Sequence, residues 1–357
     1  MDASSRLVVT YLANVLWQTP VILGIAVLCS KLIRRSPWSH RHILWVAVLV
    51  LSVLLPFWSL GSLAQNRVWP IPLGAPVVWI VVGLYAQFLL LRLIVLCSSW
   101  RHTDRLLRAA YLRSVPGPLV AIVESCAIAW AMHDIPVLGS RELQGPATLG
   151  FRRPVLLLPE RFFGGLIAET DVASAVHHEL AHIRRHDYVR NVICEILYLP
   201  VSFHPAAVFI KARIDQTREL ACDEMAAAKS SSRIAYAQSL LNIAQAICPA
   251  SQWERSSHAL ALFDTDSLEE RIKNLLMPSN RLHNAAARLL ALCGLGLLAL
   301  ACLAVSRFHV RIADAVGVAP RLQISSPHSE VQTARNEADR EPWSPAAPIH
   351  QFDGRTS

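Results

Sequence analysis

The segment VASAVHHELAHIRRHD, residues 172–187, decides how the rest of the chain is interpreted. It follows an acidic start and contains neither Gly nor Pro, so we expect a helix. His178 and His182 are four residues apart and would lie on one helix face, where two imidazoles can bind the same metal ion. Glu179 lies beside them, where a carboxylate can take a proton from metal-bound water. The pattern predicts a catalytic zinc site, although a short His-Glu-x-x-His sequence also arises by chance on ordinary helices.

A catalytic zinc ion usually has three protein ligands and one open position, so a third ligand must come from another segment. His186 is a poor candidate, because it lies about 12 Å beyond His178 along a helix axis. The metzincin continuation of the motif is excluded as well. It needs Gly at position 185 and His at position 188, where this chain has Arg185 and Tyr188.

A second acidic pair lies in QTRELACDEMAAA, residues 216–228, where Glu219 and Asp223 would share a helix face. The pair resembles the Glu-x-x-x-Asp motif of gluzincin metallopeptidases, in which the Glu is a zinc ligand and the Asp holds a ligating histidine. The resemblance implies that Glu219 is the third ligand and that Asp223 orients a histidine. Without the first motif, the same two acids would suit a solvated helix face.

The composition indicates a membrane protein. Hydrophobic residues make up 53% of the 357 residues and charged residues only 17%. The net charge of +8 could indicate nucleic-acid binding, but many of the basic residues flank apolar runs, as in membrane proteins, and no DNA-binding motif is present. The eight cysteines show no Cys-x-x-Cys spacing, so we expect most of them to be small buried residues.

Four apolar runs predict transmembrane helices, at residues 7–30, 42–66, 68–91 and 289–306. The first run is too long for a cleavable signal peptide and has no evident cleavage site. Basic residues follow the first and third runs: Lys31, Arg34, Arg35 and Arg41, then Arg101, Arg105, Arg108 and Arg113. By the positive-inside rule, both termini lie outside and the segment between the third and fourth runs lies in the cytoplasm.

The predicted organisation is therefore a mainly helical membrane protein with four transmembrane helices and a cytoplasmic α+β domain between the third and fourth. Residues 1–97 form the N-terminal membrane domain, 98–288 the zinc domain, 289–306 the fourth span and 307–357 a short external tail. Within the zinc domain, IPVLGS, ATLGF and PVLLLP read as short strands. Further helices are expected at about 205–229, 231–247 and 267–277. The tail is rich in charges and prolines, and we expect it to be disordered.

The order of these motifs resembles that of the BlaR/MecR-type integral-membrane zinc metallopeptidases, whose best-known members are β-lactam sensors. The matching segments are GFRRPVLLLP at 150–159, HHELAHIRRHD at 177–187, RELACDEMA at 218–226 and LEERIKNLL at 268–276, together with the four spans. The resemblance implies a gluzincin domain in the cytosol of a bacterial inner-membrane protein that cleaves a transcriptional repressor, such as a winged-helix repressor, after an external signal.

The tail differs from that of the β-lactam sensors, which carry a penicillin-binding domain with a Ser-x-x-Lys nucleophile after the fourth span. The corresponding residues here contain no lysine, so we do not expect covalent sensing of β-lactams. The sequence leaves the signal, the oligomeric state and the existence of a repressor partner open.

Gluzincins hold an extended peptide substrate against a strand that precedes the zinc helix. Val155, Leu156, Leu157 and Leu158 are candidates for that strand, and they suit a core strand beneath the helix equally well. Tyr188 and Tyr236 are candidate donors to the oxyanion. Two other functions remain open: a quality-control or processing protease of the membrane, and a non-catalytic receptor or scaffold. The intact Glu179 argues against the latter, because a structural zinc site would not require it.

Overall fold

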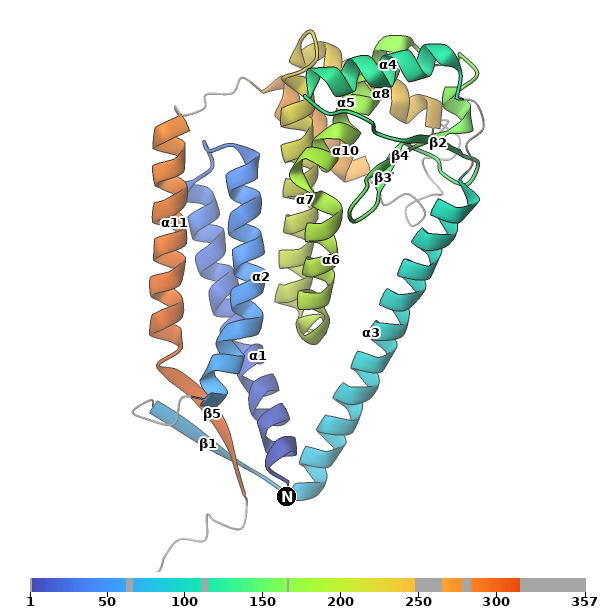
Figure 1. Cartoon of the computed structure of the whole chain (residues 1–357). Helices are drawn as coiled ribbons and strands as arrows, with labels where there is room; N and C mark the ends of the chain where they lie inside the picture. Colours follow the sequence, from blue (N-terminus) through green and yellow to red (C-terminus); the bar gives the residue numbers. More distant parts are fainter. Residues whose placement is uncertain are drawn as a thin grey trace, which may run out of the picture. The chain divides into compact units, whose positions relative to one another are not determined.

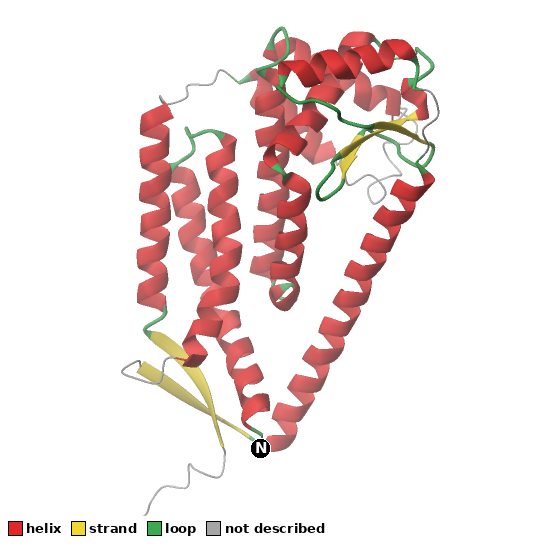
Figure 2. Ribbon diagram, viewed as in Figure 1, coloured by secondary structure: helices red, strands yellow, loops and turns green. Residues whose placement is uncertain are grey.

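The computed structural model describes residues 2–61, 67–110, 115–165, 167–247, 265–277 and 284–314. Within these ranges the protein is mainly helical, and four helices are long and apolar enough to cross a membrane (Figures 1 and 2). They are α1 (Ala3–Leu32), α2 (Trp38–Gly61), α3 (Ala75–Ala109) and α11 (Asn284–Val305). The predicted fold class, a mainly helical membrane protein with a small sheet, is confirmed.

The spans form helices because a helix satisfies its own backbone hydrogen bonds where no water is available. α1 packs against α2, α3 and α11. The core that α1 shares with α2 contains Val15 and Ile22 of α1 and Trp45 and Val48 of α2, all fully or almost fully buried. One polar contact joins α1 and α2 inside the bundle: the Gln18 amide donates to the Ser59 hydroxyl at 3.2 Å.

The third apolar run differs from its prediction. Residues Arg67–Leu73 form strand β1 instead of the first turns of a helix, and α3 begins at Ala75. α3 then continues to Ala109, so the predicted domain boundary between residues 97 and 98 falls inside this helix. The segment that follows the apolar run is polar but favours helix, so nothing in it ends the helix at the membrane.

The first part of the predicted disordered tail is ordered. Residues Phe308–Asp314 form strand β5, which pairs with β1 in a two-stranded sheet. The Asn14 amide of α1 fixes β5 at its centre, because it donates to the Val310 carbonyl at 3.0 Å and accepts from the Val310 N–H at 3.0 Å. Residues 315–357, the remainder of the predicted tail, lie outside the described residues.

The part of the chain that follows α3 and precedes α11 in sequence forms a three-stranded sheet and a group of helices. The strands are β2 (Val137–Ser140), β3 (Ala147–Leu149) and β4 (Val155–Pro159), in the order β2-β4-β3. β4 pairs parallel with β2 and antiparallel with β3. Gly150 allows the tight turn between β3 and β4, because its φ of 117° is a conformation that other residues rarely adopt.

The helices of this domain include the four predicted from the sequence, at residues 172–187 and at about 205–229, 231–247 and 267–277. In chain order, the helical elements are α4 (Gly117–Ala129), the 3₁₀ turn η1 (Glu160–Phe162), α5 (Glu169–Arg185), α6 (Asp187–Tyr198), the 3₁₀ turn η2 (Leu199–Val201), α7 (Pro205–Ala227), α8 (Arg233–Ile247) and α10 (Thr265–Leu276). α5 is the central helix: it packs against α4, α7, α8 and β3. Val176 and Leu180 of α5 are completely buried in one core with Leu156 and Leu158 of β4.

Candidate metal centre

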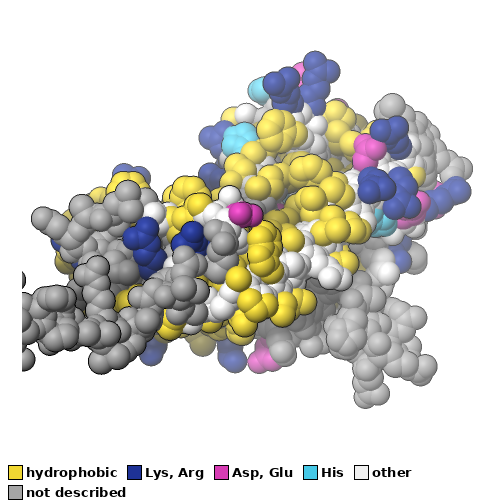
Figure 3. Space-filling model, turned by 90° about the horizontal axis from the view of Figure 1, so that it is seen from below, with side chains coloured by type: hydrophobic (Ala, Val, Ile, Leu, Met, Phe, Trp, Pro, Cys, Tyr) yellow, Lys and Arg dark blue, Asp and Glu magenta, His cyan; other side chains and the backbone are white. Residues whose placement is uncertain are grey.

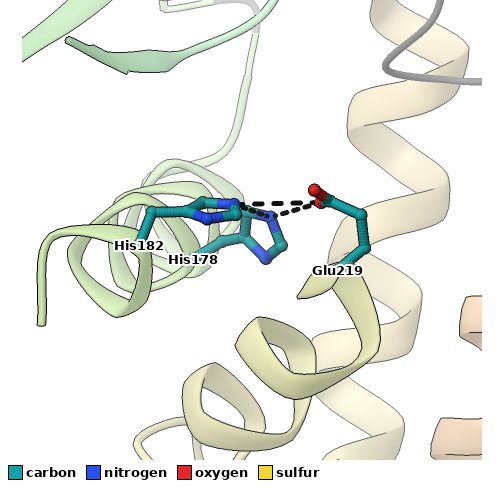
Figure 4. Close-up of side chains that lie close together, drawn as sticks. All are labelled: His178, His182 and Glu219. Atoms are coloured by element: carbon teal, nitrogen blue, oxygen red, sulfur yellow. Dashed lines mark hydrogen bonds and ion pairs between the residues drawn. The ribbon is translucent and has the colours of Figure 1, made fainter. Parts of the chain in front are cut away.

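α5 positions two histidines on a buried face. His178 and His182 are one helical turn apart, and their Nε2 atoms lie 3.2 Å from each other (Figure 4). Apolar residues on the adjacent face of α5 anchor the helix to the sheet and α4, so the rings are held by a packed element. The arrangement predicted from the four-residue spacing is therefore present in the structure.

The third side chain comes from α7, which packs against α5. Glu219 Oε2 lies 3.4 Å from His178 Nε2 and 3.8 Å from His182 Nε2 (Figure 4). The other carboxylate oxygen, Oε1, accepts a hydrogen bond from Arg218 at 3.2 Å. Arg218 therefore holds the carboxylate with Oε2 facing the two histidines.

The three atoms suit a small metal ion. Zinc binds imidazole nitrogen at about 2.0–2.1 Å, so the ligand atoms of a tetrahedral zinc lie about 3.3 Å apart. The three separations in this triangle, 3.2, 3.4 and 3.8 Å, are close to that value. Two imidazole nitrogens and one carboxylate oxygen are also the ligand types found in catalytic zinc sites that keep one position open.

A buried ionic network orients His178. Its Nδ1 lies 3.1 Å from Asp223 Oδ1, and the Tyr236 hydroxyl donates to the same oxygen at 2.9 Å. Arg271 of α10 donates to both Asp223 oxygens at 2.7 Å. Because the Asp223 carboxylate accepts the Nδ1 proton, the neutral form of the His178 ring has its lone pair on Nε2, the atom that faces Glu219.

Asp187 orients His182 in the way that Asp223 orients His178. Its Oδ2 lies 3.0 Å from His182 Nδ1, and it accepts hydrogen bonds from Arg185 at 2.9 Å and from the Cys222 thiol at 3.2 Å. His186 makes this contact possible, because its left-handed backbone (φ 55°) ends α5 and turns the first residue of α6 back toward the histidines. The sequence contained Asp187 within the motif but gave no basis for choosing its role.

His182, Asp187 and Cys222 form a second cluster whose ligand atoms also lie close enough together to hold an ion. Burial raises the pKa of the Cys222 thiol well above its usual value, and the nearby Asp187 carboxylate adds to this effect. The thiol therefore stays protonated and donates to Asp187. We assign this cluster to the support of His182.

The charges around the triangle favour a cation. Burial opposes the charged form of His178, but hydrogen bonds to Asp223 and Glu219 outweigh it and raise the pKa of His178 to about 9. Burial likewise opposes the Glu219 carboxylate, yet its hydrogen bond to His178 and the positive charges nearby hold the pKa of Glu219 well below its usual range. The carboxylates are thus ionised at neutral pH, and metal binding would release the proton of His178.

Glu179 points into the same cavity but is held separately. The Thr148 hydroxyl of β3 donates to Glu179 Oε2 at 2.5 Å. The cavity has a volume of about 240 Å³, and Glu179, Glu219 and both histidines are among the residues that line it. A carboxylate that lies next to the three candidate ligands and shares their cavity can accept a proton from a nucleophilic water there.

The structure corrects the predicted substrate strand. Val155–Leu158 lie in β4, which is the middle strand and has β2 and β3 on its two sides. Leu156, Leu157 and Leu158 are completely buried. β4 therefore has no free edge for a peptide, and its apolar run marks a core strand. β3 is an edge strand of the sheet, and Ala147 and Thr148 of β3 line the cavity.

Three further residues around the site have distinct positions. His177 accepts a hydrogen bond from the Trp130 indole at 3.0 Å, on the side of α5 that packs toward α4. Tyr236 is completely buried, and its hydroxyl donates to Asp223, so it is committed to the network behind His178. Tyr188 lines the cavity and remains a candidate donor to an oxyanion.

Comparison with known proteins assigns the chain to a family. Residues 71–275 match the family model described as BlaR1 peptidase M56. A search of curated proteins found no match. The matched range covers more than half of the chain and contains β3, α5 and α7, which carry the side chains described above. The chain therefore belongs to the BlaR/MecR-type family of membrane peptidases, M56.

Proposed function

We propose that this protein is an integral-membrane, zinc-dependent endopeptidase. The observation that carries the proposal is the triangle of His178 Nε2, His182 Nε2 and Glu219 Oε2, in which a carboxylate holds the Nδ1 side of each histidine. An ordinary pair of buried histidines would not require two separate carboxylate partners and a third carboxylate facing both rings. Membership of a peptidase family supports the same conclusion.

The chemistry follows from the residues in the cavity. A zinc ion held by the triangle would act as a Lewis acid and lower the pKa of a water molecule toward 7. Glu179 accepts the proton of the attacking water and returns it to the leaving amine. The Thr148 hydroxyl restricts the orientation of the Glu179 carboxylate during both transfers. Asp223 and Asp187 keep the histidines in the tautomer that presents Nε2.

The substrate is an extended peptide that pairs with β3. A peptide that adds to a sheet edge gains main-chain hydrogen bonds, and its side chains alternate between the two faces. β3 contributes Ala147 and Thr148 to the cavity, and Thr148 also contacts Glu179. A peptide along β3 would therefore pass directly beside the proton acceptor.

We infer that the catalytic domain faces the cytoplasm of a bacterial cell and that the substrate is a cytosolic protein such as a winged-helix transcriptional repressor. The orientation rests on the basic loop between α1 and α2. The choice of a repressor as the substrate rests on the family resemblance and on the order of the motifs.

The metal is tested by zinc analysis of purified variants. The wild type is expected to hold about one zinc per chain, the stoichiometry of a single catalytic site. His178→Ala, His182→Ala and Glu219→Ala should each lose it, because each removes one of three ligands. His186→Asn is the matched control, since it removes a histidine from the same motif while asparagine tolerates the left-handed backbone of this position. Retention of zinc by Glu219→Ala together with its loss from His186→Asn would show that the third ligand is wrong.

The orientation is tested by reporter fusions. The cluster Lys31, Arg34, Arg35 and Arg41 predicts that the loop between α1 and α2 is cytoplasmic. Alkaline phosphatase, which is active only outside the cytoplasm, should be active when fused after Ser357 and inactive when fused near Arg105. The reverse pattern would place the catalytic domain outside the cell and rule out a cytosolic substrate.

A further inference from the structure

The domain that carries the metal site contains an apolar helical hairpin. We call α6, η2 and the first half of α7 the α6–α7 hairpin. Its central sequence, VICEILYLPVSFHPAAVFI at residues 192–210, contains one acidic residue, Glu195, and neither Lys nor Arg. It is as apolar as a membrane span, but it is interrupted at its middle by Pro200 and Pro205, where the chain turns between the two helices.

One face of the hairpin packs against the membrane helices. α2 contacts both α6 and α7, and α1 contacts α7. Tyr198, Val201 and Ile210 are buried in the same core as Ile22 of α1 and Val48 of α2. The hairpin is therefore part of the transmembrane bundle, although it belongs in sequence to the domain between the third and fourth spans.

Contacts at the turn place it level with the middle of the spans. The Tyr85 hydroxyl, in the apolar part of α3, donates to the Pro200 carbonyl at 2.9 Å. His204 Nε2 lies 3.3 Å from the carbonyl of Leu16, in the middle of α1. The Phe203 ring makes an edge contact with Tyr85, with centroids 5.9 Å apart. Figure 1 shows α6 and α7 extending between α2 and α3 to this level.

The turn satisfies its polar groups in the way that a membrane interior requires. His204 Nδ1 accepts from the Ala206 N–H at 3.0 Å, so Nε2 carries the proton and donates to the Leu16 carbonyl. The Pro200 carbonyl, which has no helical partner at the turn, is the one that accepts from Tyr85. Further up the hairpin, Lys211 neutralises Glu195 at 2.9 Å and Asp215 at 2.7 Å.

The opposite face of the hairpin exposes large apolar side chains. Ile193, Ile196 and Val208 are each about half exposed, at 51%, 52% and 50%. The spans beside the hairpin expose similar side chains, including Leu84 of α3 at 65%. Figure 3, which views the molecule from the lower end in Figure 1, shows apolar side chains gathered over the central part, with Lys and Arg mainly at the margins.

We propose that the α6–α7 hairpin is a re-entrant element whose exposed face contacts the acyl chains of the bilayer. Acyl chains are expected to cover this face, because it continues the lipid-exposed surface of the spans at the same depth in the bilayer. α6 begins at Asp187, which holds His182, and its 12 residues span about 18 Å. Half the hydrocarbon core is about 15 Å thick. The metal site therefore lies at the membrane surface, and a substrate must reach it there.

Site-specific photocrosslinking in native membranes tests the proposal. A diazirine amino acid is introduced at Ile196 or Val208 of the full chain, and lipid adducts are identified by mass spectrometry after irradiation. Leu84 is the control for a lipid-facing position. Ile234 of α8, which is 70% exposed, is the matched control for an exposed apolar side chain away from the spans. The apolar photoreactive side chain preserves the character of each site.

We expect phospholipid adducts at positions 196 and 208. Their yields should be close to the yield at position 84 and well above the yield at position 234. Adducts at 84 but at neither hairpin position would overturn the proposal. Crosslinks from 196 and 208 to a second polypeptide would also overturn it, because a protein would then cover this face. Val208→Asp and Ile234→Asp give an independent measurement: only the first should lower the amount of protein assembled in the membrane, and equal losses would contradict the proposal. None of these outcomes depends on the proposed catalytic activity.

Discussion

Glu179→Gln is expected to slow peptide hydrolysis by about 10² to 10⁴-fold, the usual contribution of a general base. The amide keeps the size of the side chain and can still accept from the Thr148 hydroxyl, but it cannot take the proton of the attacking water. His178, His182 and Glu219 remain intact, so the variant should keep its zinc and its place in the membrane. The change therefore separates the chemistry from metal binding.

The measurement is quantitative proteomics of new N-termini in cells that express the wild type or the variant. Cleavage products of the substrate should disappear and the intact substrate should accumulate. Glu169→Gln, an exposed position in the first turn of the same helix, is the control and should behave like the wild type. If Glu179→Gln cells cleave the same proteins and induce the same genes as the wild type, proteolysis is not the output of this protein.

Arg271→Met is expected to destabilise the domain by about 3–5 kcal/mol, the usual effect of removing one partner of a buried ion pair. Arg271 and Asp223 are 5% and 1% exposed, and two hydrogen bonds of 2.7 Å join them. Methionine fills much of the same volume but leaves the Asp223 carboxylate buried without its main counter-charge. Burial then raises the pKa of Asp223 from its depressed value, and the contact with His178 weakens.

Lys273→Met is the matched control, because it removes a cation from the same helix. Lys273 pairs with Glu269 at 3.4 Å, and both side chains are largely exposed, so a loss of about 0.5 kcal/mol or less is expected. Chemical unfolding in detergent, followed by the fluorescence of the tryptophans, compares the two variants. Equal midpoints for Arg271→Met and Lys273→Met would show that the buried pair does not hold α10 to the metal site.

Local patterns in the sequence predicted most of the helices. The four spans follow from uncharged runs, and the helices of the metal-site domain follow from segments with few helix breakers. His178, Glu179 and His182 were placed from a spacing that lies within one helix, and the structure brings Glu219 and Asp223 to the same place. These features depend on residues a few positions apart, whose relation is fixed once the helix forms.

The errors concern strands and their partners. The apolar run that begins at residue 68 predicts a helix from its start, but its first residues pair with β5 near the other end of the described chain. The run at Val155–Leu158 suits a substrate strand and a core strand equally, and only the strand order places it in the centre of the sheet. Apolar content alone does not distinguish these cases, because pairing is decided by residues far away in the sequence.

The membrane spans and the His-Glu-x-x-His helix can be deduced from the sequence alone, because both are encoded in short, contiguous segments. Three other features become apparent only in the folded chain: Asp187 holds His182, β3 is the strand beside Glu179, and the α6–α7 hairpin packs among the spans. Each of these depends on a turn or on packing between distant segments. The left-handed backbone at His186 redirects Asp187, and the buried faces of α1 and α2 select which apolar helices lie against them.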